Sequence, residues 1–131
     1  MPEASYRQKD PGGGYLFVKQ DIRDYLQDII DAINEIEEFL KSIQDFGAFE
    51  NNKEKVYSTI FLLARIGEAV KKIPHSAKTR YPHIPWRDIA GMRDVLLHEY
   101  FRTDLKRVWE TAHRDLSPLK EAIAKILKDL Q

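Results

Sequence analysis

Three side chains with complementary chemistry lie close together in one apolar stretch of the chain: Arg93, His98 and Tyr100. An arginine is a permanent cation whose planar group binds phosphate oxygens. A histidine titrates near neutral pH, so it can give or take a proton. An arginine and a histidine are the minimum set of groups for cleaving a phosphodiester without a metal ion. The pattern therefore predicts a site for phosphate chemistry.

The spacing of these residues sets a geometric condition. At about 100° per residue, Arg93 and Tyr100 share one face of a helix, because seven residues make almost two turns. His98 lies about 140° around the helix from Arg93. The three side chains therefore meet only if the helix ends or bends near His98, or if the long arginine side chain wraps around it.

Two carboxylates are secondary candidates. Asp94 lies one helical turn before His98, where it would hold the imidazole in one orientation and favour its protonated form. An exposed surface charge is the alternative interpretation, and the sequence favours neither. Glu68 lies near the middle of an earlier predicted helix. We interpret its neighbour Arg65 as a surface charge, and leave open whether Glu68 helps to position the site.

Apolar residues recur at three- and four-residue steps through most of the chain, which indicates amphipathic helices. The expected helices span residues 18–43, 53–73 and 86–98, and one or two further helices follow an N-cap at Thr103. Ser117 and Pro118 either begin a new helix or kink a long one. These elements predict an all-α fold, an up-and-down bundle of four to five helices. Gly67 inside a helix predicts the close approach of a neighbouring helix, because glycine otherwise weakens a helix.

The ends of these segments are marked by glycine, proline and asparagine. Residues 1–17 contain three consecutive glycines and are expected to form a flexible N-terminal tail before a single helical domain over residues 18–131. Residues 45–52 are expected to form a turn, in which Gly47 ends one helix and the pair Asn51-Asn52 begins the next.

The composition describes one soluble domain. The 131 residues are 43% hydrophobic and 32% charged, as in globular proteins. Because the chain has no cysteine, a disulfide framework and a thiolate metal site are excluded. No apolar run is long enough to span a bilayer, and the N-terminus lacks the apolar core of a signal peptide. We therefore expect a cytoplasmic protein without a membrane partner.

Charge is unevenly distributed although the net charge is zero. Residues 1–70 carry 8 Lys and Arg against 13 Asp and Glu, whereas residues 71–131 carry 13 against 8. The basic half contains the Arg93–Tyr100 motif. This asymmetry indicates either a site that attracts a phosphate backbone or a chance difference between helix surfaces.

The motif Arg93-x4-His98-x-Tyr100 resembles that of the HepT-like branch of the HEPN superfamily. The resemblance extends roughly from Ile22 to the C-terminus and includes several further strings: Ile66-Gly-Glu-Ala69, Arg80-Tyr-Pro82, Ile84-Pro-Trp-Arg-Asp-Ile-Ala-Gly91-Met-Arg93, Tyr100-Phe101 before Asp104-Leu105, and Val108-Trp-Glu-Thr111. An isolated Arg-x4-His occurs by chance in many helices, whereas the whole series in this order is specific.

The resemblance implies a metal-independent endoribonuclease that needs no cofactor, with Arg93 and His98 as catalytic residues at the cleft of a homodimer. It also implies a toxin of a type VII-like HEPN/MNT toxin–antitoxin system. The partner would be an MntA-type minimal nucleotidyltransferase antitoxin, which transfers AMP to the tyrosine that matches Tyr100. Such AMPylation would place a phosphate beside Arg93 and exclude the RNA phosphate.

The residues themselves also favour two copies of the chain. One histidine cannot easily act as base and acid at the same instant, and a symmetric dimer supplies a second. Two alternatives stay open. The chain is either a non-catalytic, nucleotide-binding or substrate-presenting subunit of a minimal nucleotidyltransferase, or a helical dimer in which Arg93 and His98 make only structural hydrogen bonds. The complete motif favours catalysis over both.

Overall fold

The computed structural model describes residues 5–9, 15–19, 22–98 and 104–130. Side chains are described for residues 22–94, 96 and 104–130. The motif helix is thus described as far as the backbone of His98, whereas Tyr100 and the predicted N-cap Thr103 lie outside the described residues.

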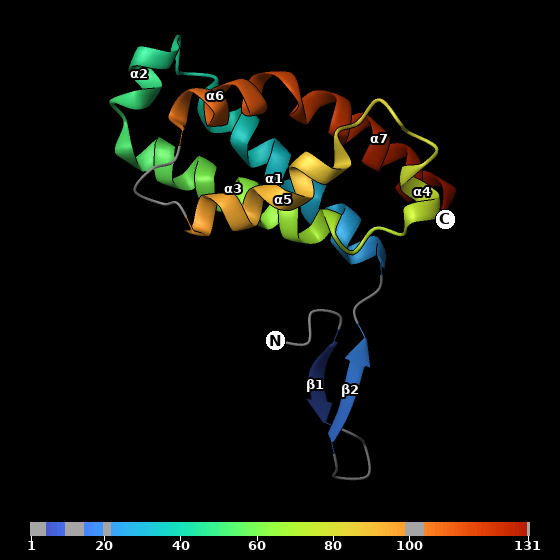
Figure 1. Ribbon diagram of the computed structural model, residues 1–131. Coiled ribbons are helices and arrows are strands. Elements are labelled where there is room, and N and C mark those ends of the chain that lie inside the picture. Colours follow the sequence, from blue (N-terminus) through green and yellow to red (C-terminus); the bar gives the residue numbers. More distant parts are fainter. Residues whose placement is uncertain (1–4, 10–14, 20–21, 99–103, 131) are drawn as a thin grey trace.

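Four antiparallel arms of helix form the domain, and each runs opposite to the arm before it (Figure 1). This arrangement confirms the predicted all-α, up-and-down bundle of four to five helices, with two short helices, α2 and α4, added in the connections. The arms are α1 (Ile22–Leu40), α3 (Lys53–Val70), α5 (Trp86–His98), and α6 (Leu105–Arg114) followed by α7 (Leu116–Asp129); α2 spans Phe46–Glu50 and α4 spans His75–Lys78.

A β-hairpin precedes the bundle in sequence. Its strands β1 (Ser5–Lys9) and β2 (Tyr15–Lys19) are antiparallel, with Ser5 opposite Lys19 and Lys9 opposite Tyr15. The connection between them contains the three glycines that suggested a tail. The flexibility predicted for residues 1–17 stays a prediction.

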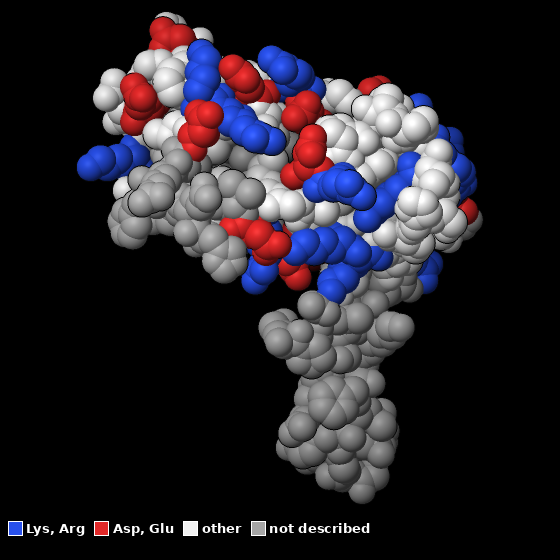
Figure 2. Space-filling model, viewed as in Figure 1, with Lys and Arg blue, Asp and Glu red and all other residues white. Residues whose placement is uncertain are grey.

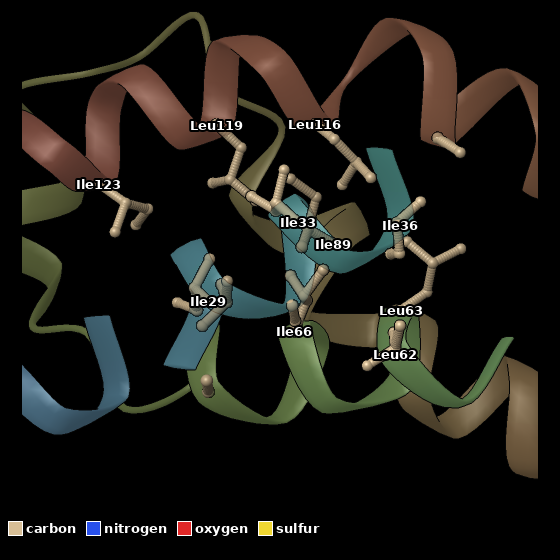
Figure 3. Close-up of a cluster of buried hydrophobic side chains, with 14 of the residues drawn as sticks. Ile29, Ile33, Ile36, Leu62, Leu63, Ile66, Ile89, Leu116, Leu119 and Ile123 are labelled. Atoms are coloured by element: carbon tan, nitrogen blue, oxygen red, sulfur yellow. The ribbon is translucent and has the colours of Figure 1, made fainter. Parts of the chain in front are cut away.

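The core lies where the four arms meet (Figure 3). Each arm contributes fully or almost fully buried aliphatic side chains at helical spacing, and each such side chain stabilises the fold by about 1.5–3 kcal/mol. They include Ile29, Ile33 and Ile36 of α1, Leu63 and Ile66 of α3, Ile89 of α5, and Leu116, Leu119 and Ile123 of α7.

The helix boundaries confirm one predicted cap and correct another prediction. Asn52 begins α3 as expected, because its side-chain oxygen accepts a hydrogen bond from the backbone N–H of Lys55 at 3.1 Å. Gly47 does not end a helix. It lies inside α2, which begins because the Asp45 carboxylate accepts a hydrogen bond from the backbone N–H of Ala48.

The last arm begins one residue later than predicted. The N-cap of α6 is Asp104 rather than Thr103, and its carboxylate accepts hydrogen bonds from two backbone N–H groups, those of Lys106 at 3.1 Å and Arg107 at 3.2 Å. The arm is interrupted only at Asp115, between α6 and α7. Pro118 lies in the first turn of α7, where its missing N–H costs little.

The Trp86 side chain holds the loop that precedes the motif helix. The Trp86 indole N–H donates to the backbone carbonyls of Lys78 at 3.1 Å and Tyr81 at 3.0 Å. Because Trp86 is the first residue of α5, these bonds anchor the start of the motif helix to the preceding loop.

Candidate active site on helices α3 and α5

Helices α3 and α5 contact each other more extensively than any other pair of elements in the described chain. Gly67 permits this contact. A Cβ at Gly67 would lie 2.7 Å from the carbonyl oxygen of Ile89 and 3.3 Å from the amide nitrogen of Arg93. Since real Cβ atoms do not approach that closely, only glycine fits here. The close approach predicted from Gly67 is therefore confirmed, and it brings the start of the motif next to α3.

Arg93 is held from α3 by Glu68. The Nε of Arg93 lies 3.1 Å from Oε2 of Glu68. This oxygen is buried although the side chain as a whole is about one-third exposed, and the contact is an ion pair rather than a well-directed hydrogen bond. A buried carboxylate oxygen needs a cation close by. The structure thus brings Glu68 and Arg93 together from positions 25 residues apart.

Asp94 and Lys71 complete a cluster of charges around Arg93. Asp94 Oδ1 lies 3.3 Å from Nη1 of Arg93, and its Oδ2 lies 3.7 Å from Nζ of Lys71. The same Nζ lies 3.9 Å from Oε2 of Glu68. We call these four residues the Arg93 cluster. The cluster has two cations and two carboxylates, so it is neutral when all four groups are ionised.

Lys71 was not predicted from the sequence as a site residue. It lies three residues after Glu68, and residues at this spacing are neighbours on a helix surface. That signal was present in the sequence, but it became meaningful only once Arg93 lay beside Glu68. The predicted contact between Asp94 and His98 stays a prediction, because the His98 side chain lies outside the described residues.

The Arg93 cluster is partly open to solvent. The Arg93 side chain is 42% exposed and that of Asp94 is 54% exposed. The Asp94–Lys71 contact at 3.7 Å is weak, and exposed pairs of this kind contribute little stability. The Asp94–Arg93 contact is shorter, at 3.3 Å, and the buried oxygen of Glu68 is the closest anionic contact of Arg93, at 3.1 Å.

A groove about 380 Å³ in volume lies on the other side of the motif helix, between α5 and α6. Acidic and basic side chains are interspersed across this face of the molecule (Figure 2). Burial raises the pKa of Asp115 in the groove; Arg114 opposes this shift, Asp88 adds to it and Arg107 opposes it. The mixed lining indicates no single class of ligand.

No group of three or more His, Cys, Asp or Glu side chains is placed to hold a metal ion in the described part of the chain. None of the described helices is both long enough and apolar enough to cross a membrane.

Comparison with known proteins supports the resemblance found in the motif. Two proteins of Methanocaldococcus jannaschii, named "Putative RNase MJ0125" and "Putative RNase MJ1216", are 46% and 43% identical to this chain over 113 residues. The alignments cover 86% of this chain and 97% and 93% of those proteins. A Thermococcus cleftensis protein named "Probable ribonuclease HepT" is 42% identical over 111 residues, which cover 85% of this chain and 100% of that protein. No solved structure matches the chain.

The family assignment rests on most of the domain. The sequence profile described as "Ribonuclease HepT-like" matches residues 29–126, which include Glu68, Arg93 and His98. The match covers well over half of the chain and agrees with the names of the similar proteins. This chain therefore belongs to the HepT-like ribonuclease family.

Proposed function

We propose that this chain is a metal-independent endoribonuclease that uses Arg93 and His98 as catalytic residues. The observation that carries the proposal is the hold on Arg93: a rigid contact between α3 and α5 places its guanidinium 3.1 Å from a buried carboxylate oxygen of Glu68. Family membership supports the same reaction class. Pre-positioned cations are effective catalysts because they need no reorganisation when charge develops on the substrate.

RNA supplies its own nucleophile, the 2′-hydroxyl. In the proposed reaction a His98 imidazole removes the 2′-hydroxyl proton, and the oxygen attacks the adjacent phosphorus. The bond from phosphorus to the 5′-oxygen breaks, and a second imidazole gives that oxygen a proton. Arg93 stabilises the negative charge that gathers on the phosphorus oxygens. The products are a 2′,3′-cyclic phosphate and a 5′-hydroxyl.

Because the reaction uses one imidazole as base and another as acid, we propose that the active form is a homodimer. Each copy would contribute one His98. The described part of α5 ends at His98, at the opposite end of the helix from Trp86.

We also propose the regulation that the family resemblance implies. The chain would be the toxin of a type VII-like pair, neutralised when an MntA-type nucleotidyltransferase transfers AMP to Tyr100. The added phosphate would compete with RNA for Arg93, which the Arg93 cluster leaves partly exposed.

The test is RNA cleavage by the purified protein in EDTA, after its intact mass has shown that Tyr100 carries no AMP. We expect cleavage with 2′,3′-cyclic phosphate ends, and cleavage at least about 100-fold slower from a His98→Ala sample prepared in parallel, which controls for contaminating nucleases. If unmodified protein leaves mixed cellular RNA intact, the ribonuclease proposal fails, and a non-catalytic partner of a nucleotidyltransferase becomes the better hypothesis.

Glu68 is expected to act as a positioning residue rather than a catalytic one. Glu68→Gln removes a negative charge beside Arg93, so RNA should bind more tightly, but the guanidinium loses the ion pair that orients it. We expect kcat to fall about 10-fold or more while KM also falls, because small misplacements of a catalytic group are costly.

Steady-state kinetics on a short RNA separate these two effects. The matched control is Glu54→Gln, which removes an exposed carboxylate of the same helix outside the Arg93 cluster. If Glu68→Gln and Glu54→Gln change kcat and KM alike, Glu68 has no positioning role.

A further inference from the structure

Lys71 has the longest contacts of the four charges in the Arg93 cluster. Its Nζ lies 3.7 Å from Oδ2 of Asp94 and 3.9 Å from Oε2 of Glu68, and both distances are too long for a hydrogen bond. Arg93 contacts the same two carboxylates at shorter distances, 3.1 Å to Glu68 and 3.3 Å to Asp94. The carboxylates therefore interact mainly with Arg93, and neither accepts a hydrogen bond from the ammonium group of Lys71.

The backbone of Lys71 is fixed at the contact between α3 and α5. Lys71 is the C-cap of α3, and its backbone N–H donates to the carbonyl oxygen of Gly67 at 3.3 Å. Gly67 is the residue that α5 approaches most closely, so the same contact positions Arg93. The Lys71 side chain is 36% exposed. It therefore extends from a fixed base to the surface of the molecule.

Arg93 and Lys71 are two neighbouring cations from different helices. Nε of Arg93 and Nζ of Lys71 both approach one atom, Oε2 of Glu68, at 3.1 Å and 3.9 Å. An RNA strand carries one phosphate per nucleotide, so a strand with one phosphate at Arg93 has another close by. A lysine binds phosphate as a point charge and does not read the bases.

A purely structural role is the competing explanation for Lys71. A cation at the C-terminal end of a helix stabilises the helix, and Lys71 also offsets the charge of two carboxylates. That role predicts a loss of stability when Lys71 is replaced. It predicts no dependence on any particular phosphate of a bound RNA.

We infer that Lys71 is a second phosphate-binding residue, which contacts a phosphate directly adjacent to the one at Arg93. The inference rests on the proposed function, which assigns the scissile phosphate to Arg93. It goes further by extending the site to a second nucleotide. It also divides the work: Lys71 contributes to affinity for RNA, whereas Arg93 stabilises the charge that develops during cleavage.

The first test is binding of a short single-stranded RNA whose 2′-hydroxyls are all methylated, so that it lacks the nucleophile and stays intact. Lys71→Gln should raise the Kd about 5- to 10-fold at low salt, as expected for a charged hydrogen bond that is partly exposed. The plot of log Kd against log salt concentration should become less steep by about 0.7, the contribution of one phosphate contact to single-strand binding. Lys125→Gln, which removes an exposed lysine of α7 outside the Arg93 cluster, should change both quantities little.

The second test locates the contact by replacing single phosphates of this RNA with uncharged methylphosphonates. A replacement at a contacted phosphate should weaken binding to the wild-type protein. In Lys71→Gln, replacement at one phosphate should no longer matter, because its partner is already lost. In Arg93→Gln, the same should hold for a directly adjacent phosphate. At all other positions the variants should respond like the wild-type protein.

Cleavage kinetics separate Lys71 from Arg93. Lys71→Gln should raise KM several-fold with kcat nearly unchanged, because the adjacent phosphate carries the same charge before and during the reaction. Circular dichroism of each variant shows whether the helical fold is intact.

The inference is overturned if folded Lys71→Gln protein binds the methylated RNA as tightly as the wild-type protein, or with the same salt dependence. It is also overturned if Lys71 is coupled to no single phosphate, or to one that is not adjacent to the phosphate coupled to Arg93. Neither binding test depends on cleavage. Wild-type protein that binds RNA through Lys71 but cuts none would therefore contradict the proposed function alone.

Discussion

Protein carrying Arg93→Ala is expected to cleave RNA about 100- to 1,000-fold more slowly than the wild-type protein, because it loses the positioned cation that stabilises the charged transition state. The loss should appear in kcat as well as in kcat/KM, since the guanidinium interacts most strongly with charge that develops during the reaction. Single-turnover cleavage of a short RNA in EDTA measures it.

Arg93→Lys is the informative companion variant. A lysine keeps the charge, but its ammonium group cannot contact Glu68 through one edge and a phosphate through another, as a guanidinium can. We therefore expect Arg93→Lys to bind RNA nearly as well as the wild-type protein and still lose most of the rate. Full activity in Arg93→Lys would show that charge alone matters and that the Glu68 contact has no part in catalysis.

His98→Ala should lower the rate by about 100- to 10,000-fold, the range for general acid–base catalysis. Its RNA affinity should stay close to that of the wild-type protein, because the cations of the Arg93 cluster are unchanged. A His98→Ala protein that cleaves at the wild-type rate, shown to be free of contaminating nuclease, would contradict the assignment of His98.

Gly67→Ala is expected to lower the free energy of unfolding by up to about 2 kcal/mol, because an overpacking cost of about 1–3 kcal/mol exceeds the gain in helix propensity. The added methyl group would lie 2.7 Å from the Ile89 carbonyl oxygen, which belongs to the backbone of α5 and cannot yield by a change of rotamer. Either α5 moves away from α3, or both helices bend. The helix propensity of alanine offsets only about 1 kcal/mol of this cost. Urea denaturation followed by circular dichroism measures the change.

Gly91→Ala is the matched control. Gly91 also lies inside a helix, but a Cβ there meets no atom within 4 Å. The same substitution should therefore stabilise the protein by about 0.5–1 kcal/mol through helix propensity alone. Equal effects at both positions would contradict the close approach of α3 and α5. Because Gly67→Ala displaces Arg93, it should also lower cleavage in the proposed reaction, whereas Gly91→Ala should not.

Local sequence patterns predicted the helices well. Each of the four arms buries one side, and burial imposes a three- and four-residue period that is visible without a structure. Details that depend on a single hydrogen bond were less predictable. Thr103 and Asp104 are both good N-cap residues, and Gly47 suits a helix end as well as a loop, so only the backbone path distinguishes the alternatives.

The site, too, was predictable in some respects and not in others. The sequence by itself determined that Arg93, His98 and Tyr100 are close together in the chain, and these residue types indicated phosphate chemistry. It also indicated a tight helix contact through Gly67. The role of Glu68 was left open, and Lys71 was not identified.

Only the tertiary structure decided that Glu68 and Lys71 lie beside Arg93 and Asp94. The physical reason is the register of α3 against α5, which depends on where two backbones can approach most closely. A helix presents its side chains in all directions, and the sequence does not state which turn of one helix will meet which turn of another. The contact at Gly67 settles that register, and with it the partners of Arg93.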